Sequence, residues 1–285
     1  MRALVLGGGG VVGLAWEAGI VAGLLDEGVD LREADAIVGT SAGSLMGTRL
    51  AAGQDVRQAE HRTSVAVPMP EGGPDLDVLR DVFARWSTAA RVDREFLLDI
   101  GALAGRARTA GEADWVAATG GSVGVASWPG DQLRVIAVDI DNAALVAFSR
   151  SSGAELARAI AASCAIPGMF PPITINGRRY MDGGVRSGTS ADVLLPDRPC
   201  AVVVIAPIVT GTAGFGALAE RCLDAEVTAL EAAGCRVTRI LPLAEEKQAF
   251  GNNLMDPSAA AAARAAGESH GRSIAADVER CWRDA

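Results

Sequence analysis

One serine of the chain stands in a context that can make it a nucleophile. Residues 39–43 read Gly-Thr-Ser-Ala-Gly, so Ser41 is the centre of a G-x-S-x-G pattern. A short apolar run, residues 36–38, precedes the pattern, and a segment typical of a helix follows it. Strand, tight turn and helix are the setting of a nucleophile elbow. Such an elbow exposes the serine above a helix N-terminus, whose free N–H groups favour an anion.

A serine hydroxyl is a poor nucleophile until a base removes its proton, and the chain offers two kinds of base. Its two histidines, His61 and His270, lie among charged or polar residues, which is typical of surface histidines. His270 nevertheless follows Asp182 in the chain, so the Ser–Asp–His order of a conventional hydrolase is available. Asp182 opens an Asp-Gly-Gly turn at the end of a predicted strand, where burial would raise its pKa toward the range of a working base. The residues alone leave both bases open.

A glycine-rich loop near the N-terminus can bind an anion. Gly7–Gly10 and Gly13 follow a short apolar strand, residues 3–6, and precede a helix expected over residues 14–27. Backbone N–H groups at such a strand end can face a phosphate or a reacting oxyanion. The Gly8–Gly13 loop also fits the dinucleotide fingerprint G-x-G-x-x-G, but the second strand ends in the Ser41 turn and not in the acidic residue that would hold a ribose. A dinucleotide-binding module is therefore the weaker alternative, and the absence of a following Lys excludes a Walker phosphate loop.

Four motifs together resemble one known family, the patatin-like phospholipases. In chain order they are the loop Gly8–Gly13, the turn at residues 39–43, the run Ala162–Pro167 (Ala-Ser-Cys-Ala-Ile-Pro) and the turn Asp182–Gly184. The resemblance covers residues 1 to about 190 and is looser beyond them. It implies a serine lipid acyl hydrolase that works with a Ser–Asp dyad and needs neither histidine nor a metal or other cofactor.

The resemblance assigns a role to each motif. The serine would attack an ester carbonyl, the aspartate would accept its proton, and backbone N–H groups would stabilise the oxyanion. The implied catalytic residues are Ser41 and Asp182; the implied oxyanion hole is Gly8, Gly9 and Gly10, with Ala42 as a further donor; and Gly39, Gly43, Gly183 and Gly184 would support the two turns.

One position departs from the family pattern. The family commonly has Arg or Lys just before the last glycine of the glycine-rich loop, and this chain has Val12 there. Loss of that cation would weaken oxyanion stabilisation or attraction to a phosphate headgroup. It puts phospholipid preference in doubt more than ester hydrolysis. Arg186, just after the Asp-Gly-Gly turn, could substitute, but a solvated or structural role is the more typical one for such an arginine.

The fold class follows from the alternation of strands and helices. The first two units, strand–glycine loop–helix and strand–elbow–helix, are typical of a mainly parallel sheet. We expect a single α/β domain over residues 1–285, with a central sheet and helices on both faces in a three-layer α/β/α arrangement. Helices predicted within residues 57–129 either pack on this domain or form a cap over the site. A C-terminal helix is expected from residue 257 to about 282, interrupted near Gly267 and Gly271.

Composition limits the partners. The chain has 285 residues, 49% of them hydrophobic, and a net charge of −9, which argues against nucleic acid as a partner. No apolar run approaches the roughly 18 residues of a transmembrane helix. Five scattered cysteines without a C-x-x-C pattern indicate free thiols in a reducing compartment. We therefore expect a cytoplasmic protein whose partner is a lipid or acyl-ester substrate, with peripheral membrane contact as an open question.

Asp139 and Asp141 are expected in a turn and not at a metal.

Overall fold

The computed structural model describes residues 1–57, 70, 73–208 and 214–283. The described strands are β1 (Arg2–Leu6), β2 (Ala36–Thr40), β3 (Leu133–Asp139), β4 (Leu145–Phe148), β5 (Ile173–Ile175), β6 (Arg178–Asp182), β7 (Ala201–Ile205) and β8 (Arg236–Ile240). They form one sheet in the order β5-β6-β3-β2-β1-β7-β8, with β4 also paired to β3. From β3 to β8 the strands on this path are parallel, whereas β4, β5 and β6 join by antiparallel pairing. The sheet is mixed, with the expected parallel centre.

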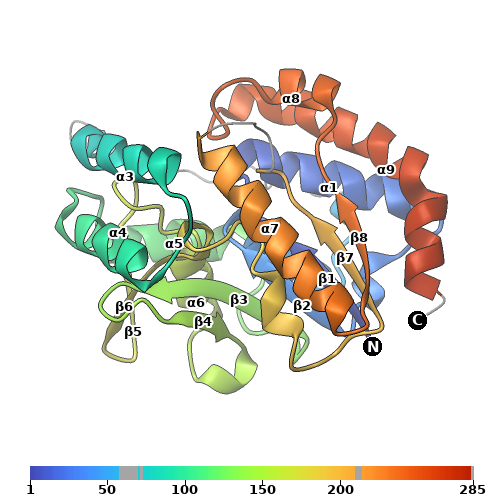
Figure 1. Ribbon diagram of the computed structural model, residues 1–285, viewed down its shortest axis with the longest axis horizontal. Coiled ribbons are helices and arrows are strands. Elements are labelled where there is room, and N and C mark those ends of the chain that lie inside the picture. Colours follow the sequence, from blue (N-terminus) through green and yellow to red (C-terminus); the bar gives the residue numbers. More distant parts are fainter. Residues whose placement is uncertain (58–69, 71–72, 209–213, 284–285) are drawn as a thin grey trace.

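Helices cover both faces of this sheet, which confirms the expected three-layer α/β/α architecture (Figure 1). Successive strand residues point to opposite faces. Leu4 and Leu6 of β1 therefore pack with α1, α2 and α9, and Ala3 and Val5 pack with α7. The described helices are α1 (Gly10–Asp26), α2 (Ala42–Ala51), α3 (Leu76–Thr88), α4 (Arg94–Arg106), α5 (Glu112–Ser122), α6 (Leu156–Ser163), α7 (Gly214–Ala232), α8 (Ala244–Phe250) and α9 (Ala260–Arg283).

The registers around β3 bring two distant strand ends together. Residue Ile136 of β3 pairs with Thr40 of β2 and with β4, so β2 and β4 occupy opposite edges of β3. The next residue, Ala137, pairs with β4 and with Asp182 of β6, so β6 continues along the edge that β2 leaves. Since β2 is parallel and β6 antiparallel to β3, their carboxyl ends meet. Ser41 and Asp182 stand at this meeting point.

Helices α1 and α9 lie side by side along the sheet (Figure 1), in contact through glycines of both helices. A Cβ built on Gly19 would lie 2.1 Å from the carbonyl oxygen of Arg264, and one built on Gly267 would lie 2.4 Å from that of Trp16. The expected interruption of the C-terminal helix is wrong, because α9 is continuous through Gly267 and Gly271. These glycines are required for close approach to α1 and do not break the helix.

The helices between α2 and β3 stand at the β6 end of the sheet (Figure 1). Asp75 caps α3, since its carboxylate accepts the N–H of Val78 at 3.2 Å. Val78 and Trp86 are buried, whereas Phe83 is 46% exposed. Helix α5 packs on α6, and through Trp115 it reaches the site described next.

Candidate active site

Ser41 occupies a strained turn between β2 and α2. Its backbone has φ 53° and ψ −120°, a positive φ that non-glycine residues rarely adopt. The turn is tight because a Cβ built on Gly39 would lie 2.5 Å from the Gly43 carbonyl oxygen, and one on Gly43 would lie 2.1 Å from that of Leu6. The Ser41 N–H donates to the hydroxyl oxygen of Ser163 at 2.9 Å. The expected elbow geometry is present.

Asp182 meets Ser41 at the end of β6. The Ser41 hydroxyl interacts with the Asp182 carboxylate, which accepts the Gly184 N–H at 2.7 Å. Burial raises the pKa of Asp182 to about 7, although both interactions act to lower it. The turn passes close to β3, because a Cβ on Gly183 would lie 2.8 Å from the Ile136 carbonyl oxygen. A carboxyl with this pKa, in contact with a serine hydroxyl, can act as a general base near neutral pH.

The expected oxyanion-hole donors differ in availability. The Gly8 backbone lies against Ser41, since a Cβ on Gly8 would be 3.4 Å from the serine Cβ. The Gly8 N–H, however, donates to a carbonyl in the loop after β6 at 2.8 Å. Within the described part of the chain, no acceptor engages the N–H of Gly9 or Gly10 at the start of α1. Ala42 begins α2, so its N–H is also outside the helical hydrogen bonds.

A narrow apolar pocket opens beside Ser41. Leu14, Leu45, Trp115 and Phe170 contribute to its walls, and its volume is about 50 Å³. The Trp115 and Phe170 rings stack with centroids 3.7 Å apart. An apolar lining suits an acyl chain, but sites for small-molecule ligands usually measure about 300 Å³ or more. An acyl chain therefore enters only if these walls move apart.

The sequence model of the patatin-like phospholipases matches residues 4–195. The chain belongs to this family. No curated protein sequence matches the chain significantly. The resemblance expected from the four motifs is thus confirmed.

Two solved structures are similar to this family member over most of its length. One is VipD from Legionella pneumophila, with a TM-score of 0.48 and 13% identity over 97% of this chain. The other is the type III effector protein ExoU, with a TM-score of 0.45 and 16% identity over 98% of this chain. The chain spans 66% of VipD and 53% of ExoU.

His270 lies apart from the serine, in a buried polar cluster. Its Nδ1 is 3.0 Å from one carboxylate oxygen of Glu246. The other carboxylate oxygen accepts the Trp16 indole N–H at 2.8 Å. The expected surface position is wrong, since His270 is only 9% exposed. Among the described residues its side-chain hydrogen bonds go to Glu246 and not to Ser41 or Asp182. This cluster joins α1, α8 and α9.

Other residues singled out by sequence have structural surroundings. Val12 is fully buried in the core, so its position offers no cation to a ligand. Arg186 forms an ion pair with Asp192. Asp139 accepts two N–H groups of the following turn at 2.9 and 3.2 Å, in line with a turn residue, and no metal-binding cluster occurs in the described ranges. His61 lies outside the described residues.

Sequence reasoning gave no role to three groups at the site. The Ser163 hydroxyl oxygen accepts the Ser41 N–H. The feature of the sequence that could have indicated this role is the position of Ser163 in the Ala162–Pro167 motif. Trp115 donates its indole N–H to the Ala161 carbonyl at 3.1 Å and forms a pocket wall. Met255 lines the same pocket from a segment more than two hundred residues after Ser41. Trp115 belongs to no motif that could have indicated this, and Met255 lies in residues 253–257, which fit the family pattern only loosely.

Proposed function

We propose that this protein is a serine hydrolase that cleaves acyl esters of lipids through an acyl-enzyme on Ser41, with Asp182 as the general base. The observation that carries the proposal is the interaction of the Ser41 hydroxyl with a buried carboxyl whose pKa is about 7. Membership of the patatin-like phospholipase family and the apolar pocket beside the serine support the lipid class of substrate.

The proposed reaction has two steps. In the first, the Ser41 oxygen attacks the ester carbonyl while Asp182 accepts the hydroxyl proton. The tetrahedral oxyanion then collapses, and the leaving alcohol takes that proton. In the second, water attacks the acyl-enzyme, Asp182 accepts a proton from it, and Ser41 leaves with the proton returned, releasing a carboxylate. The N–H groups of Gly9, Gly10 and Ala42 are the proposed oxyanion donors, each typically worth about 3 kcal/mol in the transition state.

We also propose that the helices of residues 57–129 act as a cap that meets lipid. The N-terminal turn of α3 packs on the segment leading to the pocket, since the Asp75 N–H donates to the Gly168 carbonyl at 3.0 Å. The next residue, Leu76, is 70% exposed. An exposed leucine beside an acyl pocket fits contact with a lipid surface. None of the described helices is long and apolar enough to cross a membrane.

The dyad is tested by turnover of a chromogenic acyl-ester series. Ser41→Ala and Asp182→Asn should each lower kcat by about a thousandfold or more, because each removes a member of the unit that activates the nucleophile. His270→Ala should keep kcat within about threefold while lowering the free energy of unfolding by about 3 kcal/mol, because it removes one hydrogen-bond partner of the buried Glu246 and leaves a cavity between α8 and α9.

The same series separates the alternatives. Loss of turnover in folded His270→Ala would favour a conventional Ser–His–Asp esterase. Heat of binding with NAD or FAD in calorimetry, together with no ester turnover, would favour a dinucleotide-binding module on Gly8–Gly13. The proposed hydrolase predicts neither result.

A further inference from the structure

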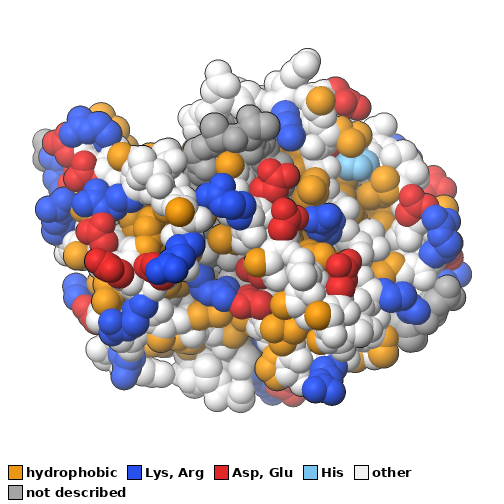
Figure 2. All heavy atoms as spheres, viewed as in Figure 1, with side chains coloured by type: hydrophobic (Ala, Val, Ile, Leu, Met, Phe, Trp, Pro, Cys, Tyr) orange, Lys and Arg blue, Asp and Glu red, His pale blue; other side chains and the backbone are white. Residues whose placement is uncertain are grey.

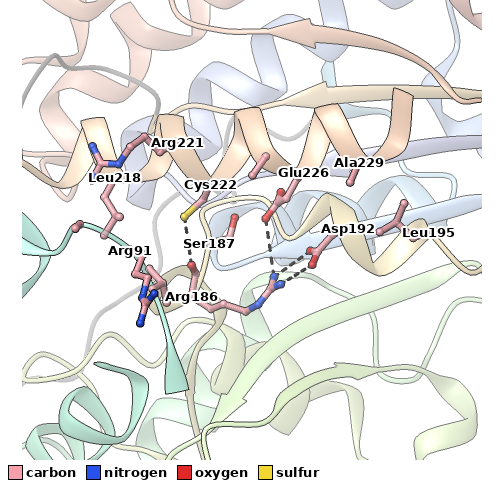
Figure 3. A pocket seen from close by; sticks show the side chains of 13 residues that line it. Arg91, Arg186, Ser187, Asp192, Leu195, Leu218, Arg221, Cys222, Glu226 and Ala229 are labelled. Carbon is pink, nitrogen blue, oxygen red and sulfur yellow. Dashed lines mark hydrogen bonds and ion pairs between the residues drawn. The ribbon is translucent and has the colours of Figure 1, made fainter. Parts of the chain in front are cut away.

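A second cavity lies on the other side of the sheet from the acyl pocket. It is a cleft of about 400 Å³ between α7, the α3–α4 connection and the segment that follows β6 (Figure 3). The volume is within the usual range for small-molecule sites. Its lining shares no residue with the apolar pocket at Ser41. We call it the α7 cleft.

Charge is distributed unevenly along the α7 cleft. Its lining includes three arginines and two carboxylic acids. Arg186 is paired with both acids, to Asp192 at 3.0 Å and to Glu226 at 3.9 Å. Arg91 and Arg221 lie at one end, away from these acids (Figure 3). These are the two arginines of the lining that its own acids do not pair, although Arg91 pairs with Asp93 outside the lining.

The two end arginines retain hydrogen-bonding capacity. Arg221 donates one N–H to the Ala89 carbonyl at 3.0 Å, and Arg91 donates one to Asp93 at 2.9 Å. A guanidinium carries five N–H donors in a planar fork that suits a carboxylate. An anionic head at this end can therefore contact either side chain without breaking the contacts that it already has.

The rest of the α7 cleft is mainly apolar. Leu218 lies beside the two arginines, and Leu195 and Ala229 lie at the far end of the drawn cleft (Figure 3). Ala225 of α7 also belongs to the lining. A compact ion such as phosphate would leave this surface in water. A ligand with an alkyl chain would cover it and gain up to about 0.8 kcal/mol for each buried methylene.

We propose that the α7 cleft binds an amphiphilic carboxylate, with its head at the end that carries Arg91 and Arg221 and its chain along α7 toward Leu195. A fatty carboxylate is the ligand of this chemistry that the proposed ester hydrolysis would release. The identification of the physiological ligand as the reaction product rests on that proposed function; the site itself does not.

The floor of the α7 cleft is connected to the catalytic residues. Arg186 lies four residues after Asp182, and its carbonyl accepts the Cys222 thiol at 3.7 Å (Figure 3). The Glu226 carboxylate accepts the Thr189 hydroxyl at 2.6 Å. In turn the Gly188 carbonyl holds the Gly8 N–H. A ligand that orders residues 186–191 therefore also acts on the glycine-rich loop that begins at Gly8. Binding of the amphiphilic carboxylate in the α7 cleft should thus alter turnover at Ser41.

Direct binding tests the α7 cleft without any assay of activity. Dodecanoate, below its micellar concentration, is titrated into Ser41→Ala in a calorimeter, so that a failure of the proposed catalysis cannot affect the result. We expect saturable binding, with affinity rising up to about fourfold for each methylene from octanoate to dodecanoate. The double substitution Arg91→Ala/Arg221→Ala should weaken it at least about tenfold.

Two further variants serve as controls. Arg80→Ala removes an exposed arginine of α3 that pairs with Asp77 outside the cleft, and it should leave the affinity unchanged. Ala225→Trp fills the cleft and should abolish binding. The proposal is overturned if dodecanoate shows no saturable binding, or if the double substitution leaves the affinity unchanged. Equal binding of inorganic phosphate, independent of chain length, would also overturn it.

Discussion

At the scale of single residues, the ionisation of Asp182 sets the pH at which the site can react. Burial raises the pKa of this carboxyl to about 7, so it is largely protonated at pH 5 and largely ionised at pH 8. A general base works only when ionised. The kcat/KM of a soluble ester should therefore fall about tenfold for each pH unit below 7 and level off above it.

The pH profile has an internal control. His270→Ala should show the same profile as the unsubstituted protein, because the ionisation belongs to Asp182. A kcat/KM that stays constant between pH 5 and pH 8, in protein that remains folded throughout, would rule out Asp182 as the base.

Ser163 is the residue that we expect to position the nucleophile. Its hydroxyl oxygen accepts the N–H of Ser41, whose positive φ the surrounding chain must maintain. Ser163→Ala should lower kcat by about tenfold with little change in KM, because it loosens the elbow and leaves the pocket walls in place. Ser273→Ala is the matched control, since that hydroxyl donates within α9 to the His270 carbonyl. An unchanged kcat in Ser163→Ala would remove Ser163 from the catalytic arrangement.

At the scale of elements, local patterns predicted the strands and the elbow but not how they meet. The apolar runs that became β2, β3 and β7 are evident in the sequence, because buried parallel strands are continuously apolar. The meeting of β2 and β6, about 140 residues apart in the chain, on one edge of β3 depends on the antiparallel pairing of β6 with β3. No local pattern encodes that register, so the resemblance to a family was needed to associate Ser41 with Asp182.

The C-terminal helix shows why local reasoning fails in the opposite direction. Glycine costs about 1 kcal/mol relative to alanine inside a helix, which led to the expected interruption near Gly267 and Gly271. Local reasoning did not include the partner helix α1, in which Gly19 and Gly23 are four residues apart, as Gly267 and Gly271 are in α9. His270 was misjudged for the same reason, since its polar sequence neighbours do not reveal that its own side faces α1.

This helix contact gives a prediction about stability. Gly267→Ala should lower the free energy of unfolding by about 2–4 kcal/mol, because the new Cβ would lie 2.4 Å from the Trp16 carbonyl oxygen and would push α9 from α1. Gly121→Ala is the control, since a Cβ there meets nothing within 4 Å, and it should be neutral or stabilising. Urea unfolding measures both. Equal effects of the two substitutions would show that helix propensity, and not close packing, determines the cost.

At the scale of the whole molecule, charge and apolar exposure are segregated. Residues 74–108 contain six arginines and six acidic residues, so the net charge of −9 resides in the rest of the chain. This neutral part carries two exposed large apolar side chains on α3, Leu76 at 70% and Phe83 at 46%, two helical turns apart. Figure 2 shows it as a lobe at one end of the molecule, beside a hollow. A neutral lobe with apolar tips can approach lipid without the repulsion that the acidic body would meet at an anionic surface.

Contact with lipid through this lobe should be separable from the chemistry at Ser41. The double substitution Leu76→Ser/Phe83→Ser should lower hydrolysis of phosphatidylcholine vesicles by about tenfold or more, because each apolar side chain contributes roughly 1.5–3 kcal/mol when it leaves water. Turnover of a short soluble ester should not change, since neither side chain lines the acyl pocket. Leu243→Ser is the control, because this leucine is similarly exposed, at 44%, but directly precedes α8, which stands apart from α3 (Figure 1). Equal loss on vesicles and on the soluble ester would mean that the substitutions damage the site itself, and an equal effect of Leu243→Ser would mean that any exposed leucine serves. Only a loss confined to vesicles and to α3 would place the lipid surface against the part of the molecule next to the acyl pocket.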